Sequence, residues 1–141
     1  MRARALLPLA TITAVAALAL PSPASPAAQT TQICGQLNGP HASWTLTLPG
    51  RKPIKLTGNR WTVFLTGTMP CAKAVKVVPG LLKQWAKTSN QNLIKPGLTG
   101  YFCSRDSSGG QGACLKGTSL NITFIMTGPY TIAQIRQLGV S

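Results

Sequence analysis

The sequence has 141 residues and is strongly basic, since 14 Lys and Arg side chains accompany a single acid, Asp106, for a formal net charge of +13. It contains one histidine, His41, and four cysteines. This composition excludes reactions that need a pair of carboxylates and metal sites built from several carboxylates. The length indicates a single domain.

The first 27 residues have the order of a secretory signal peptide. Arg2 and Arg4 form a basic head, an apolar stretch covers residues 5–20, and the small, turn-forming segment PSPASPAA follows. The alternative is an uncleaved membrane anchor. The stretch is shorter and richer in Ala than the roughly 20 strongly apolar residues that a good span needs, so the pattern favours a signal peptide.

Small residues at the last and third-last positions allow cleavage after Ala24 or after Ala27. We expect residues 1–27 to be removed and residues 28–141 to form one exported domain. Only two basic residues leave with the signal peptide, so the remaining chain keeps a net charge of +11.

Export would place the cysteines in an oxidising space, where an even number predicts disulfides. A zinc site is the alternative, but the sequence has no Cys-x-x-Cys pair. Four cysteines allow three pairings. We expect Cys71–Cys103 with Cys34–Cys114, because long closed loops constrain the unfolded chain most. The pairing Cys34–Cys71 with Cys103–Cys114 comes next.

The first half of the exported chain predicts a loose leader at residues 25–33 and then a strand meander at residues 43–66. The segment SWTLTL at residues 43–48 alternates apolar and polar side chains, which is typical of a half-buried strand. Turn signals at Pro49-Gly50 and at Thr57-Gly58-Asn59 divide the meander into two or three antiparallel strands.

Residues 69–87 predict a helix, because apolar or small side chains recur at helical spacing. Thr68 is expected to cap its start. Pro79, followed by glycine, is expected to kink or break the helix near Val78. A polar loop is expected at residues 88–99.

The last third predicts a hairpin over residues 100–116 with a floppy, glycine-rich tip at 104–113, and then a strand at 120–126. Thr131-Ile-Ala-Gln134 has the capping-box form, so a short helix is expected at 132–138. The expected class is α+β: a small antiparallel sheet packed on one kinked helix, with two disulfides and a short C-terminal helix.

Catalytic chemistry is not expected. A Ser-His-Asp arrangement would need His41 and Asp106, but Asp106 lies in the expected floppy tip, where nothing would hold it rigidly. A cysteine nucleophile would need an unpaired thiol beside a base. Trp44, Trp61 and Trp85 fit core positions better than a ligand platform. We expect no enzymatic activity and no cofactor or metal.

Basic side chains give the clearest indication of binding. The candidate contacts to a polyanion are Arg51, Lys52 and Lys55 near a predicted turn, and Lys73, Lys76, Lys83 and Lys87 on the polar side of the predicted helix. The expected partner is an anionic cell-wall polymer or a membrane surface, in the extracellular or cell-envelope space. No nucleic-acid-binding motif is present, and we expect a monomer. Simple solvation of a basic exported protein is the alternative.

One constellation resembles a recurrent group of small secreted actinobacterial proteins over residues 68–126. It consists of Cys71-Ala-Lys-Ala74 at a helix start, Gly100-Tyr-Phe-Cys103, and a third cysteine soon after in Cys114-Leu-Lys-Gly117. The resemblance implies export and the fold, and it brings neither an activity nor site residues. The pair Pro79-Gly80 departs from the unbroken helix usual in that group.

A second, superficial resemblance concerns the segment Cys103-Ser-Arg105-Asp106. It is similar to the cysteine-flanked reactive loop of the subtilisin inhibitors that actinobacteria secrete, which also have two disulfides. The cysteine spacing differs, because the close pair in this sequence brackets the glycine-rich tip. Protease inhibition is therefore the alternative function, and a rigid segment 104–113 would favour it.

Overall fold

The computed structural model describes residues 30–87, 92–93, 98–117 and 119–140. The predicted signal peptide and most of the predicted loop 88–99 lie outside these residues. The elements in chain order are β1 (Thr31–Leu46), β2 (Ile54–Thr66), α1 (Cys71–Trp85), β3 (Asn92–Leu93), β4 (Tyr101–Arg105), β5 (Gln111–Lys116), β6 (Ser119–Met126) and α2 (Ile132–Leu138).

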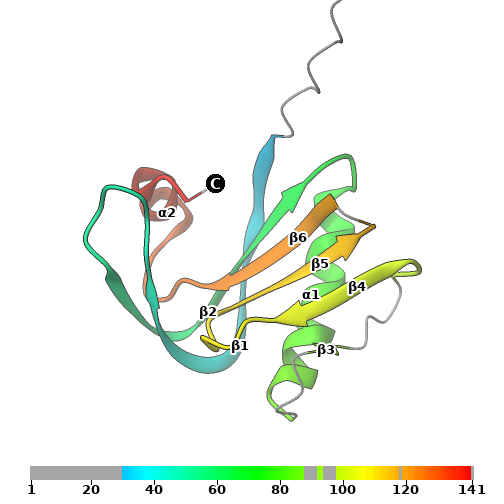
Figure 1. The fold of residues 1–141 in the computed structure, drawn as a ribbon, viewed down its shortest axis with the longest axis horizontal. Helices are drawn as coiled ribbons and strands as arrows, with labels where there is room; N and C mark the ends of the chain where they lie inside the picture. The colour runs from blue at the N-terminus through cyan, green and yellow to red at the C-terminus, as the bar shows by residue number, and fades with distance from the viewer. Residues whose placement is uncertain (1–29, 88–91, 94–97, 118, 141) are drawn as a thin grey trace, which may run out of the picture.

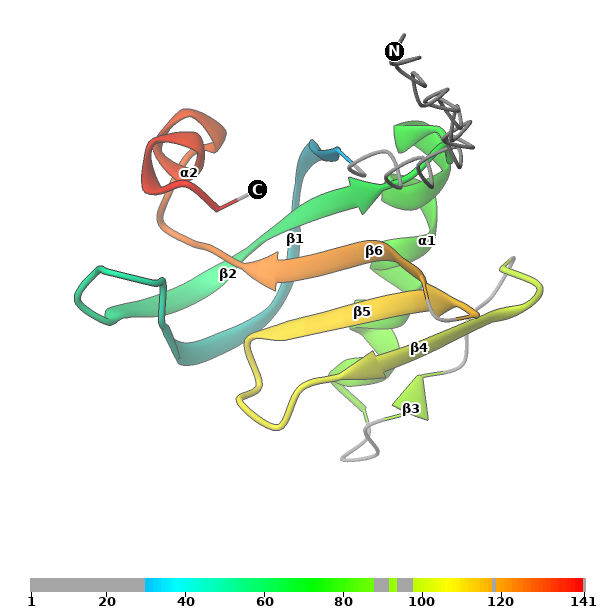
Figure 2. The same cartoon turned by 45° about the horizontal axis from the view of Figure 1, so that its top comes forward.

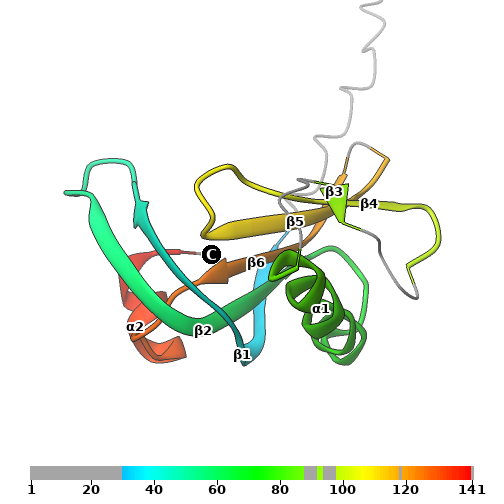
Figure 3. The ribbon, with the colours of Figure 1, turned by 90° about the horizontal axis from the view of Figure 1, so that it is seen from below.

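The strands form one antiparallel sheet of six strands. Their order is β1-β2-β6-β5-β4-β3, which can be followed in Figure 2. Helix α1 packs on one face of the sheet, and α2 lies at the end where β1 and β2 extend beyond the other strands (Figures 1 and 3). The predicted α+β class with an antiparallel sheet is confirmed.

The hairpin of β1 and β2 is longer than the predicted meander. Strand β1 begins at Thr31, so the prediction of a loose leader through residue 33 is wrong, and β2 runs without a break through the predicted turn at 57–59. The early part of β1 shows no clear alternation, and it becomes a strand by pairing with residues 60–66 of β2. The predicted turn at Pro49-Gly50 is confirmed.

An irregularity in the pairing bends β1. The register shifts between Asn38 and Ala42, so the segment Gly39-Pro40-His41 bulges from the ladder. The Trp61 indole N–H donates to the Pro40 carbonyl at 2.9 Å. A β-carbon on Gly39 would lie 2.5 Å from the Trp61 ring, so only glycine lets the bulge pack this closely.

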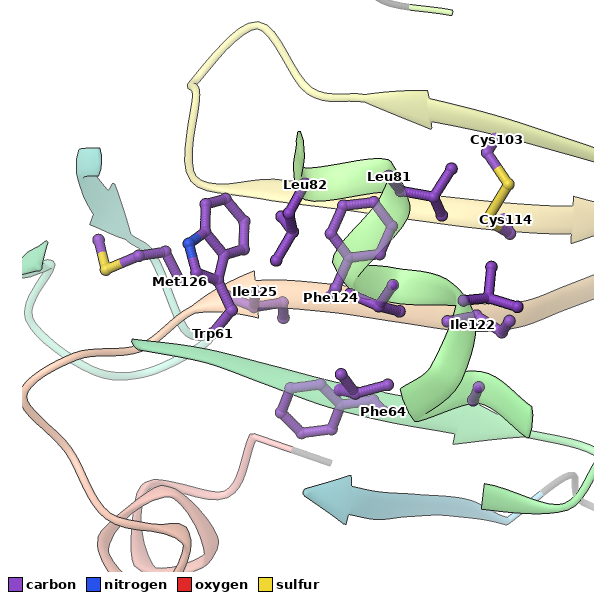
Figure 4. Packing of buried hydrophobic residues seen from close by; sticks show 14 of the residues in the cluster. Trp61, Phe64, Leu81, Leu82, Cys103, Cys114, Ile122, Phe124, Ile125 and Met126 are labelled. Atoms are coloured by element: carbon purple, nitrogen blue, oxygen red, sulfur yellow. A yellow bond between two sulfur atoms is a disulfide. The ribbon is translucent and has the colours of Figure 1, made fainter. Parts of the chain in front are cut away.

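The core lies between α1 and the centre of the sheet. The register pairs apolar residues across β2 and β6: Trp61 with Met126, Val63 with Phe124, and Leu65 with Ile122. Figure 4 shows Leu81 and Leu82 of α1 beside the rings of Phe124 and Trp61. Trp85 meets both rings, with centroid distances of 5.1 Å to Trp61 and 6.0 Å to Phe124. The tryptophans are therefore core residues, as predicted.

Helix α1 differs from its prediction at two points. It begins at Cys71 after Pro70 and has no side-chain cap, so the expected capping by Thr68 is wrong. It also continues through Pro79 to Trp85, so the expected break is absent. Pro79 lies on the exposed side, while buried residues before and after it hold the helix on the sheet. A milder bend at Pro79 stays a prediction.

The disulfides join Cys34 to Cys71 and Cys103 to Cys114, so the expected pairing of Cys71 with Cys103 and Cys34 with Cys114 is wrong. The register of β4 and β5 puts Cys103 directly opposite Cys114, with 4.0 Å between the Cα atoms. Loop length governs how much a bond stabilises the fold, but strand register decides which cysteines are neighbours. With every thiol bonded, the alternative of a zinc site is also excluded.

The C-terminal helix α2 matches its prediction. Thr131 and Gln134 form the capping box, and Gly139 ends the helix in the left-handed conformation. Ile135 is buried, and the side chain of Gln36 on β1 donates to the Tyr130 carbonyl at 2.9 Å. These contacts hold the segment before α2 against β1.

Candidate functional site: a basic helix face

Four lysines form one line along α1, which we call the lysine stripe: Lys73, Lys76, Lys83 and Lys87. All four side chains are exposed. At 3.6 residues per turn they fall within an arc of about 80°, and the stripe is about 21 Å long. The apolar positions of α1 lie on the other side of the helix, against the sheet. The helix thus separates its cations from its core residues, as its sequence pattern predicted.

The last member of the stripe, Lys87, lies just beyond α1. Its backbone N–H donates to the Gln84 carbonyl at 2.9 Å, so a final turn holds it in line with the helix. The expected placement of these four lysines on the polar side is therefore confirmed for the whole group.

Among the described residues, no carboxylate side chain lies beside the stripe, because the only acidic side chain of the sequence, Asp106, accepts hydrogen bonds within its own turn. The lysine ammonium groups must be balanced by ions or by an anionic ligand. A groove of about 280 Å³ adjoins Lys83, between α1 and the bulge of β1, with Pro40 and Leu82 among its lining residues.

The hairpin cations do not join the stripe. Arg51, Lys52 and Lys55 are exposed at the tip of the β1–β2 hairpin. Figures 1 and 3 show that this tip projects at the far end of the molecule from α1. The candidate polyanion contacts therefore form two separate groups, and only the four on the helix lie along one line.

The glycine-rich tip between β4 and β5 is ordered by Asp106, so the prediction of a floppy tip is wrong. One carboxylate oxygen accepts from the Ser108 backbone N–H at 2.6 Å, and the other accepts from the Gln111 side chain. The bond from Ser108, followed by that from Gln111, lowers the pKa of Asp106. The Asp106 N–H donates to the Gln111 carbonyl at 2.8 Å and closes the turn.

The base of this tip is buried. The Gly110 carbonyl accepts from the Met126 N–H at 2.8 Å, and Gly110 lies against the ring of Trp44. Gly110 belongs to the tip, Met126 to β6 and Trp44 to β1, so only the pairing of distant strands brings them together. The composition of the tip does not contain this information and indicated a flexible segment. His41 lies exposed in the bulge of β1, and the oxygens of Asp106 are bound by residues of its own turn.

A second concavity lies near this tip, and the sequence did not predict it. It has a volume of about 280 Å³ and is lined by Ser104, Arg105, Asp106, Gln111, Gly112, Ala113 and Thr123. The exposed ring of Phe102 was also missed. The alternation around Cys103 is the signal that could have found it, because a strand with a buried Cys103 turns Phe102 to the opposite face.

Comparison of the chain with models of protein families, with curated proteins and with solved structures gave no match. In the part of the chain that the structure describes, no helix is both long and apolar enough to cross a membrane. The two disulfides indicate an oxidising environment. Fold and site together define a small, disulfide-stapled α+β protein with a basic helix face.

Proposed function

We propose that the protein is an exported, non-enzymatic binding protein of the cell envelope that holds an anionic wall polymer along α1. The observation that carries the proposal is the lysine stripe, with four exposed ammonium groups along about 21 Å of one helix face. A flexible polymer with regularly spaced charges can follow such a line. Each ammonium–anion contact releases a counterion and so adds to the affinity.

The chemistry of the stripe favours a polymer over a specific small ligand. Lysine acts as a point charge on a flexible stem, whereas planar, bidentate recognition of one phosphate or carboxylate is the role of arginine. The structure describes no arginine on α1. The expected contact is therefore distributed, dependent on salt and tolerant of the exact repeat of the polymer.

The same helix face favours a polymer over the interior of a membrane. Apart from the lysines, the exposed positions of α1 and its last turn are Ala72, Pro79 and Ala86. Helices that lie in a membrane interface insert large apolar or aromatic side chains, which this face lacks. Export itself is supported by the signal-peptide pattern, by the two disulfides and by the resemblance to small secreted actinobacterial proteins.

Sedimentation experiments test this proposal. The processed protein is mixed with cell walls that carry anionic polymer, with the same walls after chemical removal of the polymer, and with liposomes containing anionic lipid. Retention on the untreated walls alone supports the proposal. Equal binding to liposomes favours a membrane surface, and an absence of binding to all three contradicts the proposal.

Protease inhibition is the second candidate, because the ordering of the tip by Asp106 supplies the preorganisation that an inhibitory loop needs. Against it, the tip is a closed turn whose Gly110 carbonyl is bound inside the sheet, whereas proteases bind extended segments. Titration of subtilisin activity with the protein tests this candidate. Stoichiometric loss of activity would favour inhibition over the proposal above.

A further inference from the structure

The sheet face opposite α1 carries a second arrangement of side chains, independent of the lysine stripe. Along β4, Cys103 points into the core, so its neighbours Phe102 and Ser104 point away from α1. The register places Ser104 opposite Ala113, and Ala113 opposite Thr123 on β6. Figures 1 and 3 show no described helix over this side of β4 and β5.

The cavity of about 280 Å³ lies on this face, next to the β4–β5 tip. Its polar lining residues are Ser104, Arg105, Asp106, Gln111 and Thr123. The Gln111 NH₂ already donates to Asp106, which leaves the Gln111 carbonyl oxygen as an acceptor. Asp106 accepts three bonds from its own turn, from the Ser107 hydroxyl, the Ser108 N–H and the Gln111 amide. A carboxylate has about four acceptor positions, so one position remains. The cavity is therefore rich in acceptors and suits a ligand with several hydroxyl donors.

An exposed aromatic ring lies on the same face of β4 as this cavity, next to its lining and not part of it. Phe102 is 51 % exposed and is the only large apolar side chain exposed to that extent in the described part of the chain. It lies two positions from Ser104 on the same side of β4, a spacing of about 6.6 Å. An exposed ring at the edge of a polar cavity provides a flat apolar surface without desolvating the polar groups.

The charges of the site narrow the class of ligand. Arg105 contributes to the lining, but its guanidinium lies over the Trp85 ring at 5.3 Å from the centroid, on the α1 side of the sheet. The polar groups that remain are one carboxylate and neutral groups, which disfavours an anion. The net charge of +11 on the exported chain disfavours a free cation.

We infer that this face binds a neutral sugar residue, with the C–H side of a pyranose ring on Phe102 and its hydroxyls directed to Ser104, Asp106, Gln111 and Thr123. A pyranose with equatorial hydroxyls has the required shape, with an apolar face and a rim of donors and acceptors. The inference does not rest on the proposed polyanion site, because the two surfaces lie on opposite sides of the sheet. It adds a second specificity to the protein, for a neutral glycan.

The test is a nuclear magnetic resonance titration of the ¹⁵N-labelled processed protein with cellotriose and, separately, with tri-N-acetylchitotriose. Amide shifts are expected at residues 102–104, 111–113 and 123. Phe102→Ala should weaken binding by roughly 3- to 10-fold, while Phe102→Trp, which keeps an aromatic surface, should retain it. Because Phe102 is exposed, neither change threatens the core. Thr123→Val, which keeps the shape and removes the hydroxyl, should also weaken binding.

The matched control is Lys76→Gln combined with Lys83→Gln on the opposite face, which should leave sugar binding unchanged. The inference is overturned if neither sugar shifts these amides up to about 10 mM, tenfold above a millimolar dissociation constant. It is also overturned if Phe102→Ala binds as well as the unaltered protein, or if tetramethylammonium competes as effectively as the sugars. A parallel titration with poly(glycerol phosphate) should shift amides of α1 alone, so failure of one site is distinguishable from failure of the other.

Discussion

Neutralising the lysine stripe should abolish most of the salt-dependent binding of an anionic polymer. The variant carries Lys73→Gln, Lys76→Gln, Lys83→Gln and Lys87→Gln. Glutamine and lysine have similar helix propensities, and the four side chains are exposed, so α1 should fold as before. The change removes four positive charges from one helix face and leaves the core untouched.

The magnitude follows from counterion release. For a flexible single-stranded polyanion, each neutralised charge contributes about −0.7 to the slope of log affinity against log salt concentration. Four contacts give a slope of about −3, so affinity for poly(glycerol phosphate) should fall roughly 50-fold between about 50 and 200 mM salt. The variant should lose nearly all of this slope. Fluorescence anisotropy of a labelled polymer, measured across that salt range, gives both slopes directly.

A control variant with the same net charge separates the stripe from charge in general. It carries Arg51→Gln, Lys52→Gln, Lys55→Gln and Arg136→Gln, which remove four charges from the hairpin tip and α2, away from α1 (Figure 1). This control should keep a slope near −3. Equal losses in both variants would refute the reasoning, because binding would then follow net charge and not the stripe. Circular dichroism confirms that both variants are folded.

Three further predictions concern stability and folding. Replacing Cys34 and Cys71 by alanine opens a loop of 37 residues and should lower the free energy of unfolding by about 4 kcal/mol, measured by urea titration; an unchanged midpoint would contradict this. Gly110→Ala would put a β-carbon 2.0 Å from the Trp44 ring and should cost about 1–3 kcal/mol, visible as a lower melting temperature than that of the unaltered protein. The folded-state pKa of Asp106 is lowered, so its contribution to stability is present above the unfolded pKa of about 3.9 and is lost as the pH falls through the folded value. Asp106→Asn should therefore flatten the acid dependence of the urea midpoint below about pH 4, and parallel curves would refute this account.

Local patterns in the sequence predicted several elements correctly. The capping box at Thr131 fixed the start of α2, the apolar spacing placed α1 and its lysine stripe, and the alternation at residues 120–126 identified β6. Each of these features depends on residues only a few positions apart. Such signals can be judged without knowledge of the rest of the chain.

Features set by pairing between distant segments could not be predicted. The first half of β1 is a strand because β2 lies beside it, and Cys103 bonds Cys114 because of the register of β4 and β5. The tip is held by the hydrogen bonds of Asp106 and by the bond from the Met126 N–H to the Gly110 carbonyl. The amino-acid composition of the tip predicts neither of them. The cavity on the open face likewise gathers residues from β4, β5 and β6.

The position of β6 has a consequence for the order in which the chain can fold. This strand is the last in the sequence, yet it lies in the middle of the sheet, between β2 and β5. Its register joins Leu65 to Ile122 and Trp61 to Met126. The two strands on one side, β1 and β2, and the three on the other, β3, β4 and β5, therefore have no common ladder until β6 is inserted. Pairing between such distant segments loses loop-closure entropy before its contacts form, so folding is slow. Until β6 is inserted, the edges of β2 and β5 that it will cover stay unpaired. A chain whose synthesis or transport stalls before residue 119 lacks β6. The core rings of Trp61 and Trp85 would then stay exposed and could bind another chain before the sheet is complete.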